Sequence, residues 1–249
     1  MKIGIVLLLI STVVWVLLLQ NPGNIMTIEH CAVSDAGPSA TSLQMLLDMN
    51  PISSQLIGWG LMVVAMMLPK LILPVEDIYA KSLKRNRLPL ALLFVFGYLT
   101  VWMLVGFLMI CLILLLHLLM PGSFIPVITV GLIAIIWQFS PIKQRCLNYG
   151  QRHWTLPAFG WLAYRDALLY GLTHGVWCVG AGWALMLMPM LLPSGHNLAM
   201  IVVTFIMLSE HLEMPRAPGW RIDFRTRLFR IAVAQTQIKL KQFRTSNGS

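Results

Sequence analysis

The sequence is poor in charge: only 11% of its 249 residues are Asp, Glu, Lys or Arg, whereas 58% are apolar. Its mean hydropathy is +0.78. Soluble domains carry about 25% charged residues, so this composition predicts an integral membrane protein. Walker, dinucleotide-binding and zinc-ribbon motifs are absent, and so are paired catalytic carboxylates and a Ser-His-Asp set. The sequence therefore identifies no catalysed reaction and favours a protein that is not an enzyme.

Cysteine is scarce, and no Cys-x-x-Cys motif occurs among Cys31, Cys111, Cys146 and Cys178. The spans expected below place only Cys31 on the outer side of a membrane. Structural disulfides form in oxidising compartments, where the other three thiols are not expected. No intrachain structural disulfide is predicted.

Lys and Arg are missing from three connections, which suggests how the chain crosses a membrane. Apolar segments with lengths that suit a hydrocarbon layer of ~30 Å are expected to span it at 3–19, 54–73, 89–119, 124–139, 165–192 and 197–212. The outer connections, 20–53, 120–123 and 193–196, then lack Lys and Arg, and all 18 basic residues lie at or near the cytoplasmic side. The positive-inside rule favours this orientation, with both termini in the cytoplasm.

These spans predict an all-α fold, a polytopic membrane bundle of six transmembrane helices in residues 1–214. The first span is expected to be an uncleaved anchor because no small-x-small cleavage site follows it. Residues 41–50 are expected to form a short amphipathic helix in the outer loop, and Pro69 a kink. The basic residues 215–249 are predicted to lie on anionic lipid as a cytoplasmic helix. The expected location is a bacterial inner membrane, and the net charge of +9 indicates topology, not a nucleic-acid partner.

The fifth span holds a histidine and a cysteine four residues apart, His174 and Cys178. Four residues are just over one helical turn, so both side chains share a face. Glycines surround them, and glycines in an apolar helix allow another backbone to approach closely. Polar side chains in a span usually face the protein interior. We expect this segment to be a central helix with His174 and Cys178 directed toward Met66 or Met67.

Soft metal ligands gather in the same half of the predicted bundle. Imidazole, thiolate and thioether together suit copper(I), whereas zinc accepts the first two. The candidate metal ligands are Met62, Met66, Met67, Cys146, His174, Cys178 and Glu210. Methionine also fills gaps in apolar cores, and a lone histidine in a span can hydrogen-bond to a neighbouring helix. For Glu210, an ion pair with Lys143 or Arg145 is the alternative.

A looser collection lies toward the outer side. It comprises Met186, Met188, Met190, His196 and Met200, with His117, Met120 and the pair His30-Cys31 from other segments. Methionines at every second position do not share one helix face, unless Pro189 unwinds the segment. These residues are therefore not included in the predicted site.

Three motifs resemble those of a known family. They are Trp59-x-x-Met62-x-x-Ala65-Met66-Met67-x-Pro69, Gln138-x-x-Pro141-x-Lys143-x-x-Cys146-Leu147, and His174-Gly175-x-x-Cys178-x-Gly180-x-x-Trp183-Ala184-Leu185-Met186, followed by Glu210. In this order they resemble a bacterial family of uncharacterised, predicted metal-binding integral membrane proteins. The resemblance covers roughly residues 55–212. It implies a helical membrane protein with proposed binding of copper or a similar soft metal, and no established reaction.

The chain departs from the family pattern at three thiols. Ala181 and Gly182 stand where the family usually has two cysteines, and Gly150 replaces a third. We expect a membrane protein that binds or handles copper at a His/Cys/Met site, with a metal-carrier protein or a membrane protein as partner. The alternative, which the missing thiols favour, is a non-catalytic accessory or assembly subunit that binds no metal.

Overall fold

The computed structural model describes residues 2–20, 51–120, 125–152, 160–192 and 195–220, together with positions 44, 47, 48, 154, 157, 234 and 236. The expected helix at 41–50, most of the outer loop and most of the basic tail lie outside these residues. Within the described ranges all regular secondary structure is helical, which confirms the all-α expectation.

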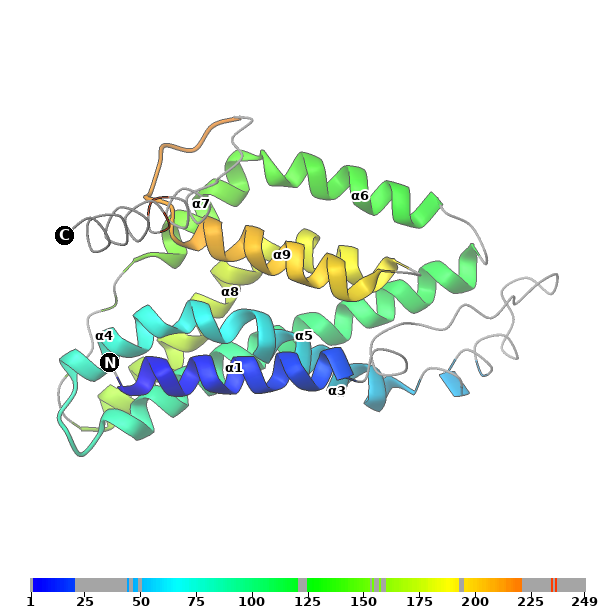
Figure 1. Ribbon diagram of the computed structural model, residues 1–249. Helices are drawn as coiled ribbons and strands as arrows, with labels where there is room; N and C mark the ends of the chain where they lie inside the picture. Colours follow the sequence, from blue (N-terminus) through cyan, green and yellow to red (C-terminus); the bar gives the residue numbers. More distant parts are fainter. Residues whose placement is uncertain are drawn as a thin grey trace, which may run out of the picture.

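The helices run back and forth along one common axis (Figure 1). The elements are α1 (Lys2–Gln20), α3 (Ile52–Met67), the 3₁₀ turn η1 (Leu68–Leu71), α4 (Ile72–Lys81), α5 (Arg87–Leu119), α6 (Ile125–Gln138), α7 (Pro141–Gly150), α8 (Trp161–Leu191) and α9 (His196–His211). The ends of α4 and α9, the start of α8 and all of α7 lie at one end of the bundle, which we name the α7 end. The starts of α3, α6 and α9 lie at the opposite end.

The second expected span is longer than predicted and irregular at its middle. Proline has no N–H to donate, so Pro69 interrupts the α-helical ladder, and η1 forms there. The helix then resumes as α4. The expected end of this span at residue 73 is wrong, because α4 runs to Lys81 and only residues 82–86 connect it to α5.

The fourth expected span bends into a short helix. Gln138 ends α6, and the Oγ atom of Ser140 accepts a hydrogen bond from the Lys143 backbone N–H at 3.1 Å, which caps the start of α7. Pro141 at the first position also favours helix initiation. The axes of α6 and α7 meet at 64°. The expected spans ended at residue 139 and began again at residue 165, so α7 is a helix that the spans did not include.

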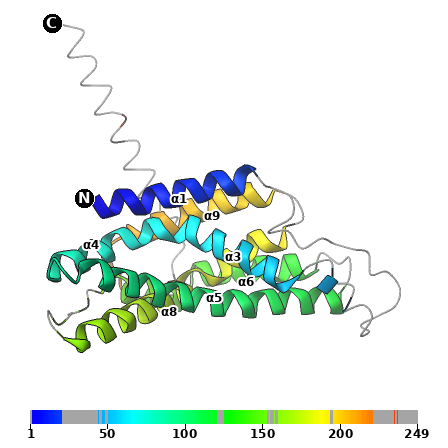
Figure 2. The same ribbon diagram turned by 90° about the horizontal axis from the view of Figure 1, so that it is seen from below.

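The most extensive helix contact joins α5 and α8 (Figure 2). A Cβ atom on Gly171 would lie 2.1 Å from the Phe94 carbonyl oxygen, and one on Gly97 would lie 2.8 Å from the Leu168 carbonyl oxygen. Only glycine permits backbones to approach this closely. The expectation that the glycines of this span allow close helix contact is confirmed.

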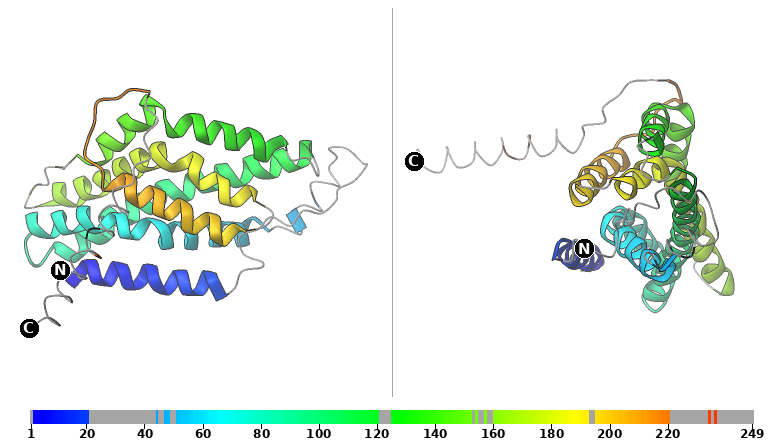
Figure 3. Two further views of the ribbon diagram at one scale, coloured as in Figure 1. Left: turned by 45° about the horizontal axis from the view of Figure 1, so that its top comes forward. Right: turned by 90° about the vertical axis from the view of Figure 1, so that its right-hand side faces the viewer.

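Helix α1 lies at the periphery, beside α3 and α4 (Figure 3). A hydrogen bond of 2.7 Å from Ser11 Oγ to the Ala65 carbonyl ties it to α3. In the described ranges, four helical stretches are long and apolar enough to cross a membrane, or five if the bent α6–α7 pair counts as one. The expected number of six spans and their orientation remain predictions.

Candidate metal centre

His174 lies inside the bundle near the α7 end, as expected from its position on α8. Its side chain is 5% exposed. Aromatic rings surround it: the centroid of the imidazole is 5.8 Å from those of Phe94 and Tyr98 on α5 and 6.0 Å from that of Tyr170 on α8. The ring of His211, from the end of α9, approaches it edge-on at 6.5 Å. Two imidazoles from different helices therefore meet in an aromatic environment.

Cys178 follows one turn later on α8 and has two polar neighbours. The Tyr98 hydroxyl oxygen lies 3.2 Å from its Sγ atom, within hydrogen-bonding distance. The ammonium group of Lys70 lies 3.9 Å from the same sulfur. Lys70 is only 5% exposed and belongs to η1. The irregularity at Pro69 thus positions a buried positive charge beside the thiol.

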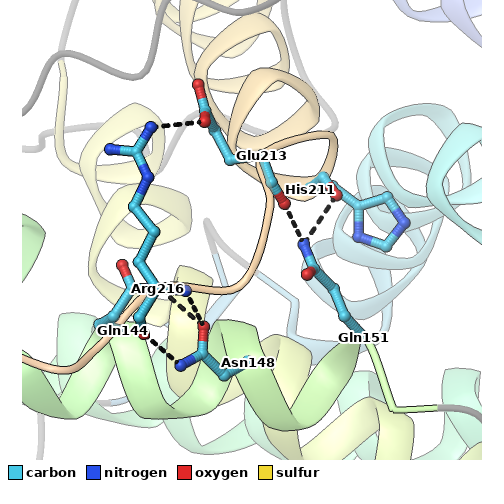
Figure 4. Close-up of polar contacts among 6 residues, drawn as sticks. All are labelled: Gln144, Asn148, Gln151, His211, Glu213 and Arg216. Carbon is cyan, nitrogen blue, oxygen red and sulfur yellow. Dashed lines mark hydrogen bonds and ion pairs between the residues drawn. The ribbon is translucent and has the colours of Figure 1, made fainter.

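Two amide side chains of α7 and that of Gln151, just after α7, hold the chain segment from His211 to Arg216 (Figure 4). The amide of Gln151 donates to the carbonyls of His211 and Glu213, at 3.1 and 2.6 Å. Asn148 donates to the Arg216 carbonyl at 2.6 Å and accepts from the Arg216 N–H at 3.3 Å. Gln144 donates to Asn148 at 2.7 Å. These bonds satisfy carbonyls at the end of α9 and hold His211 over His174.

Glu210 forms a buried ion pair with Lys143, which confirms one of the two alternatives for this residue. The Lys143 Nζ atom is 2.8 Å from Glu210 Oε1, and the side chains are 0% and 3% exposed. Gln138 bridges the pair, because its amide donates to Glu210 and its carbonyl accepts from Lys143, both at 2.5 Å. Charged groups survive burial when paired and hydrogen-bonded in this way. The network joins α6, α7 and α9.

Two further sulfur atoms lie close to α8. A Cβ atom on Gly180 would lie 2.7 Å from Cys146 Sγ, so Cys146 packs against a side of α8 different from the one that carries His174 and Cys178. A Cβ atom on Gly182 would lie 2.1 Å from the terminal methyl of Met207. Position 182 lies one turn beyond Cys178, and the resembled family has a cysteine there. The thioether of Met207 occupies the space beside this position.

The other sequence candidates are distributed differently. Met66 and Met67 are each 1% exposed, in the last turn of α3 before η1. Their approach to His174 stays a prediction. Met62 lines a cavity with His196 at the opposite end. Among the residues that the structure describes, no three His, Cys, Asp or Glu side chains group closely enough to hold a metal ion. Copper(I) also accepts thioethers, so methionine sulfur could complete a set of ligands that His and Cys side chains alone do not provide.

Sequence reasoning missed Lys70, Tyr98 and Met207 and assigned no role to His211. A lysine inside an apolar span is costly and usually functional, so Lys70 could have been identified from its position alone. Tyr98 and Met207 carried no comparable signal, because aromatic and methionine residues are common in apolar helices. Their proximity to α8 depends on how the helices pack.

The comparisons with known proteins point to copper. Neither a curated protein nor a solved structure matches the chain. The model of a family described as PpoB2, copper chaperone, matches residues 56–222. This range includes η1, α5, α7, α8 and α9, which together form the site around His174 and Cys178. Because the match covers more than half of the sequence, the chain belongs to the PpoB2 copper chaperone family.

Proposed function

We propose that this protein is a membrane-embedded copper chaperone that holds copper(I) on the His174–Cys178 face and passes it to a partner protein. The single observation that carries this proposal is the meeting of the His174 and His211 rings inside a helix bundle of a copper chaperone family, with Cys178 one turn further along α8. Thiolate and imidazole are favourable ligands for copper(I). The i,i+4 spacing on α8 brings the sulfur and the ring to the same side of one helix.

Transfer of the ion requires a site that binds without enclosing it. Cys178 is partly exposed, while His174 is buried. Copper(I) with few ligands can exchange stepwise, as a thiolate of the partner bonds to the ion before the Cys178 thiolate leaves. The proton of the Cys178 thiol is released when copper binds and returns when copper departs, as metal ligation by cysteine requires. Copper remains in the +1 state throughout.

The surface of the bundle supports a location in a membrane, which we propose to be the bacterial inner membrane. Large apolar side chains point outward along the helices; they include Leu9, Leu92, Phe96, Leu104, Leu108, Ile128 and Ile135, each at least 58% exposed. Such an extended apolar surface suits hydrocarbon rather than water. Six spans with both termini inside remain our proposal for the topology, supported by the absence of Lys and Arg from the outer connections.

A competition titration tests the proposal. The full-length protein in detergent competes for copper(I) with the chromophoric chelator bicinchoninate. Cys178→Ser and His174→Ala should each weaken binding at least about tenfold, or ~1.4 kcal/mol. The matched control is Cys111→Ser, which removes an exposed thiol from α5 and should bind like the wild type. If the wild type competes no better than Cys178→Ser, the glycine face of α8 is only a packing surface and the accessory-subunit alternative is correct.

A further inference from the structure

A second group of soft ligands lies at the end of the bundle opposite α7, where α3, α8 and α9 converge. A narrow cavity there, with no room for a water molecule, is lined by Gln55, Gly58, Trp59, Met62, Met190 and His196. Its two methionines come from different helices, and its histidine begins α9. Met62 and Met190 are 1% and 6% exposed, and His196 is 8% exposed. Three potential metal donors thus border one small, buried space.

Helix geometry explains why these donors meet. Pro189 does not unwind its segment, because α8 continues through it to Leu191. Met186 and Met190 therefore lie one turn apart on one buried face, whereas Met188 is only partly buried. This arrangement directs Met190, and not Met188, toward the α3 helix that carries Met62.

The imidazole of His196 is oriented by a backbone hydrogen bond. Its Nδ1 atom lies 2.7 Å from the Pro189 carbonyl oxygen. A carbonyl oxygen only accepts, so Nδ1 carries the proton and the lone pair of the neutral ring is on Nε2. Histidines that bind metals commonly donate their other ring N–H to a carbonyl in this way, which fixes both tautomer and ring orientation.

Gln55 supplies an independent indication of a ligand. Its side chain is 3% exposed, and Oε1 has no hydrogen-bond partner among the described residues. Buried polar atoms are normally paired, and an unpaired acceptor in a cavity wall favours a bound cation or donor. Trp59, in contrast, is fully engaged, because its indole N–H donates to the Trp102 carbonyl at 2.9 Å. The buried polar atom without a partner among the described residues that line the cavity is therefore Gln55 Oε1.

We propose that this cavity is a second copper(I) site, formed by the thioethers of Met62 and Met190 and the Nε2 atom of His196, with Gln55 Oε1 beside them. Two thioethers select copper(I) over zinc, magnesium and calcium. The site is separate from the one at His174 and Cys178, because twelve residues of α8 correspond to about 18 Å along the helix. In the topology proposed above, it is the outer of the two sites.

The number of copper(I) ions per chain tests this proposal. The full-length protein is saturated with copper(I) under anaerobic conditions, passed through a desalting column and analysed for metal. The wild type should retain two ions, and Met62→Leu/Met190→Leu should retain one. Leucine conserves volume, so this variant should fold, and His196→Gln provides an independent second variant. Met109→Leu removes a buried methionine of α5 that does not line the cavity and should retain two.

Combination with Cys178→Ser separates the two proposed sites. Cys178→Ser should retain one ion, and the combined variant none. If the wild type retains one ion that is lost in Cys178→Ser and kept in Met62→Leu/Met190→Leu, the second site is refuted and the proposed function stands. If the single ion shows the opposite pattern, the second site stands and the proposed function is refuted. A wild type that retains no copper(I) overturns both.

Discussion

At the scale of single residues, the proposed site combines a soft sulfur with a buried ammonium. Lys70, which is 5% exposed, approaches Cys178 to 3.9 Å, and the Tyr98 hydroxyl of α5 lies 3.2 Å from the same sulfur. A fixed positive charge repels a metal cation that approaches the same sulfur, and the repulsion is strong where water is scarce. We infer that Lys70 lowers the affinity for copper(I) and thereby keeps the ion exchangeable.

Removal of this charge should tighten binding. Lys70→Leu is expected to raise the affinity for copper(I) about tenfold, ~1.4 kcal/mol. Lys70→Met should raise it further, because methionine adds a thioether near Cys178. Both variants are measured by chelator competition. The comparison between them separates the effect of the lost positive charge from the effect of the added thioether. Loss of binding in both variants would show that the ammonium organises the site instead of opposing the ion.

Met207 offers a second test at this scale. Its terminal methyl occupies the space beside Gly182, one turn from Cys178 on α8. If its sulfur assists copper(I), Met207→Leu should weaken binding about threefold to tenfold while the volume of the core is conserved. Chelator competition measures the change, with Met109→Leu as the control. Unchanged affinity would assign Met207 to packing alone.

Residue identity explains why part of this site could be predicted. The i,i+4 spacing of His174 and Cys178 is visible in the sequence, and a polar pair in an apolar helix indicates an inward face. Their partners come from η1, α5 and α9, far away in the sequence. Contacts of this kind depend on helix rotation and depth, which hydropathy does not specify.

At the scale of helices, the contact between α5 and α8 positions the site. Gly171→Ala would bring a Cβ atom to within 2.1 Å of the Phe94 carbonyl oxygen, and backbone cannot yield locally. The variant should lose about 1–3 kcal/mol of stability, as overpacked cores do. The control is Gly131→Ala on α6, whose Cβ would meet only Met188 at 3.7 Å. Thermal unfolding in detergent measures both, and equal midpoints would contradict this packing.

A second contact between helices is the buried ion pair of Lys143 and Glu210, which joins α7 to α9. Lys143→Met leaves a buried carboxylate without its cation and should cost about 3–5 kcal/mol. Lys143→Met/Glu210→Gln removes the remaining charge, keeps an amide for Gln138 and should recover much of the loss. The same thermal unfolding measures both variants. A double variant as unstable as the single one would contradict the account of a paired charge.

The helices themselves were more predictable than their ends. Apolar length indicated where α5, α8 and α9 lie, but most of α4 and all of α7 fell between the expected spans. Both carry charged residues, such as Lys81 on α4 and Arg145 on α7, at one end of the bundle. The apolar run in the sequence therefore stops before these helices do, and hydropathy alone does not detect them. The signals for α7 were local: Ser140 and Pro141 form a recognisable helix start.

At the scale of the whole molecule, the proposed orientation predicts which residues an impermeant thiol reagent reaches. Native Cys146 is only 8% exposed, so its protection would reflect burial, not sidedness. A cysteine placed at the exposed Lys84, in the connection between α4 and α5, reports the α7 end directly. On intact cells, Cys31 should react and Lys84→Cys should react only after permeabilisation. The reverse pattern would contradict both termini inside.

The most direct test of the central claim is X-ray absorption at the copper edge of the protein loaded with one equivalent of copper(I). Met62→Leu/Met190→Leu serves as the background, so that the ion occupies the His174–Cys178 face. We expect a mixed shell of sulfur and imidazole nitrogen. Cys178→Ser should remove sulfur from that shell, and His174→Ala should remove imidazole scattering. An unchanged spectrum in both variants would contradict the claim that this face of α8 holds the copper.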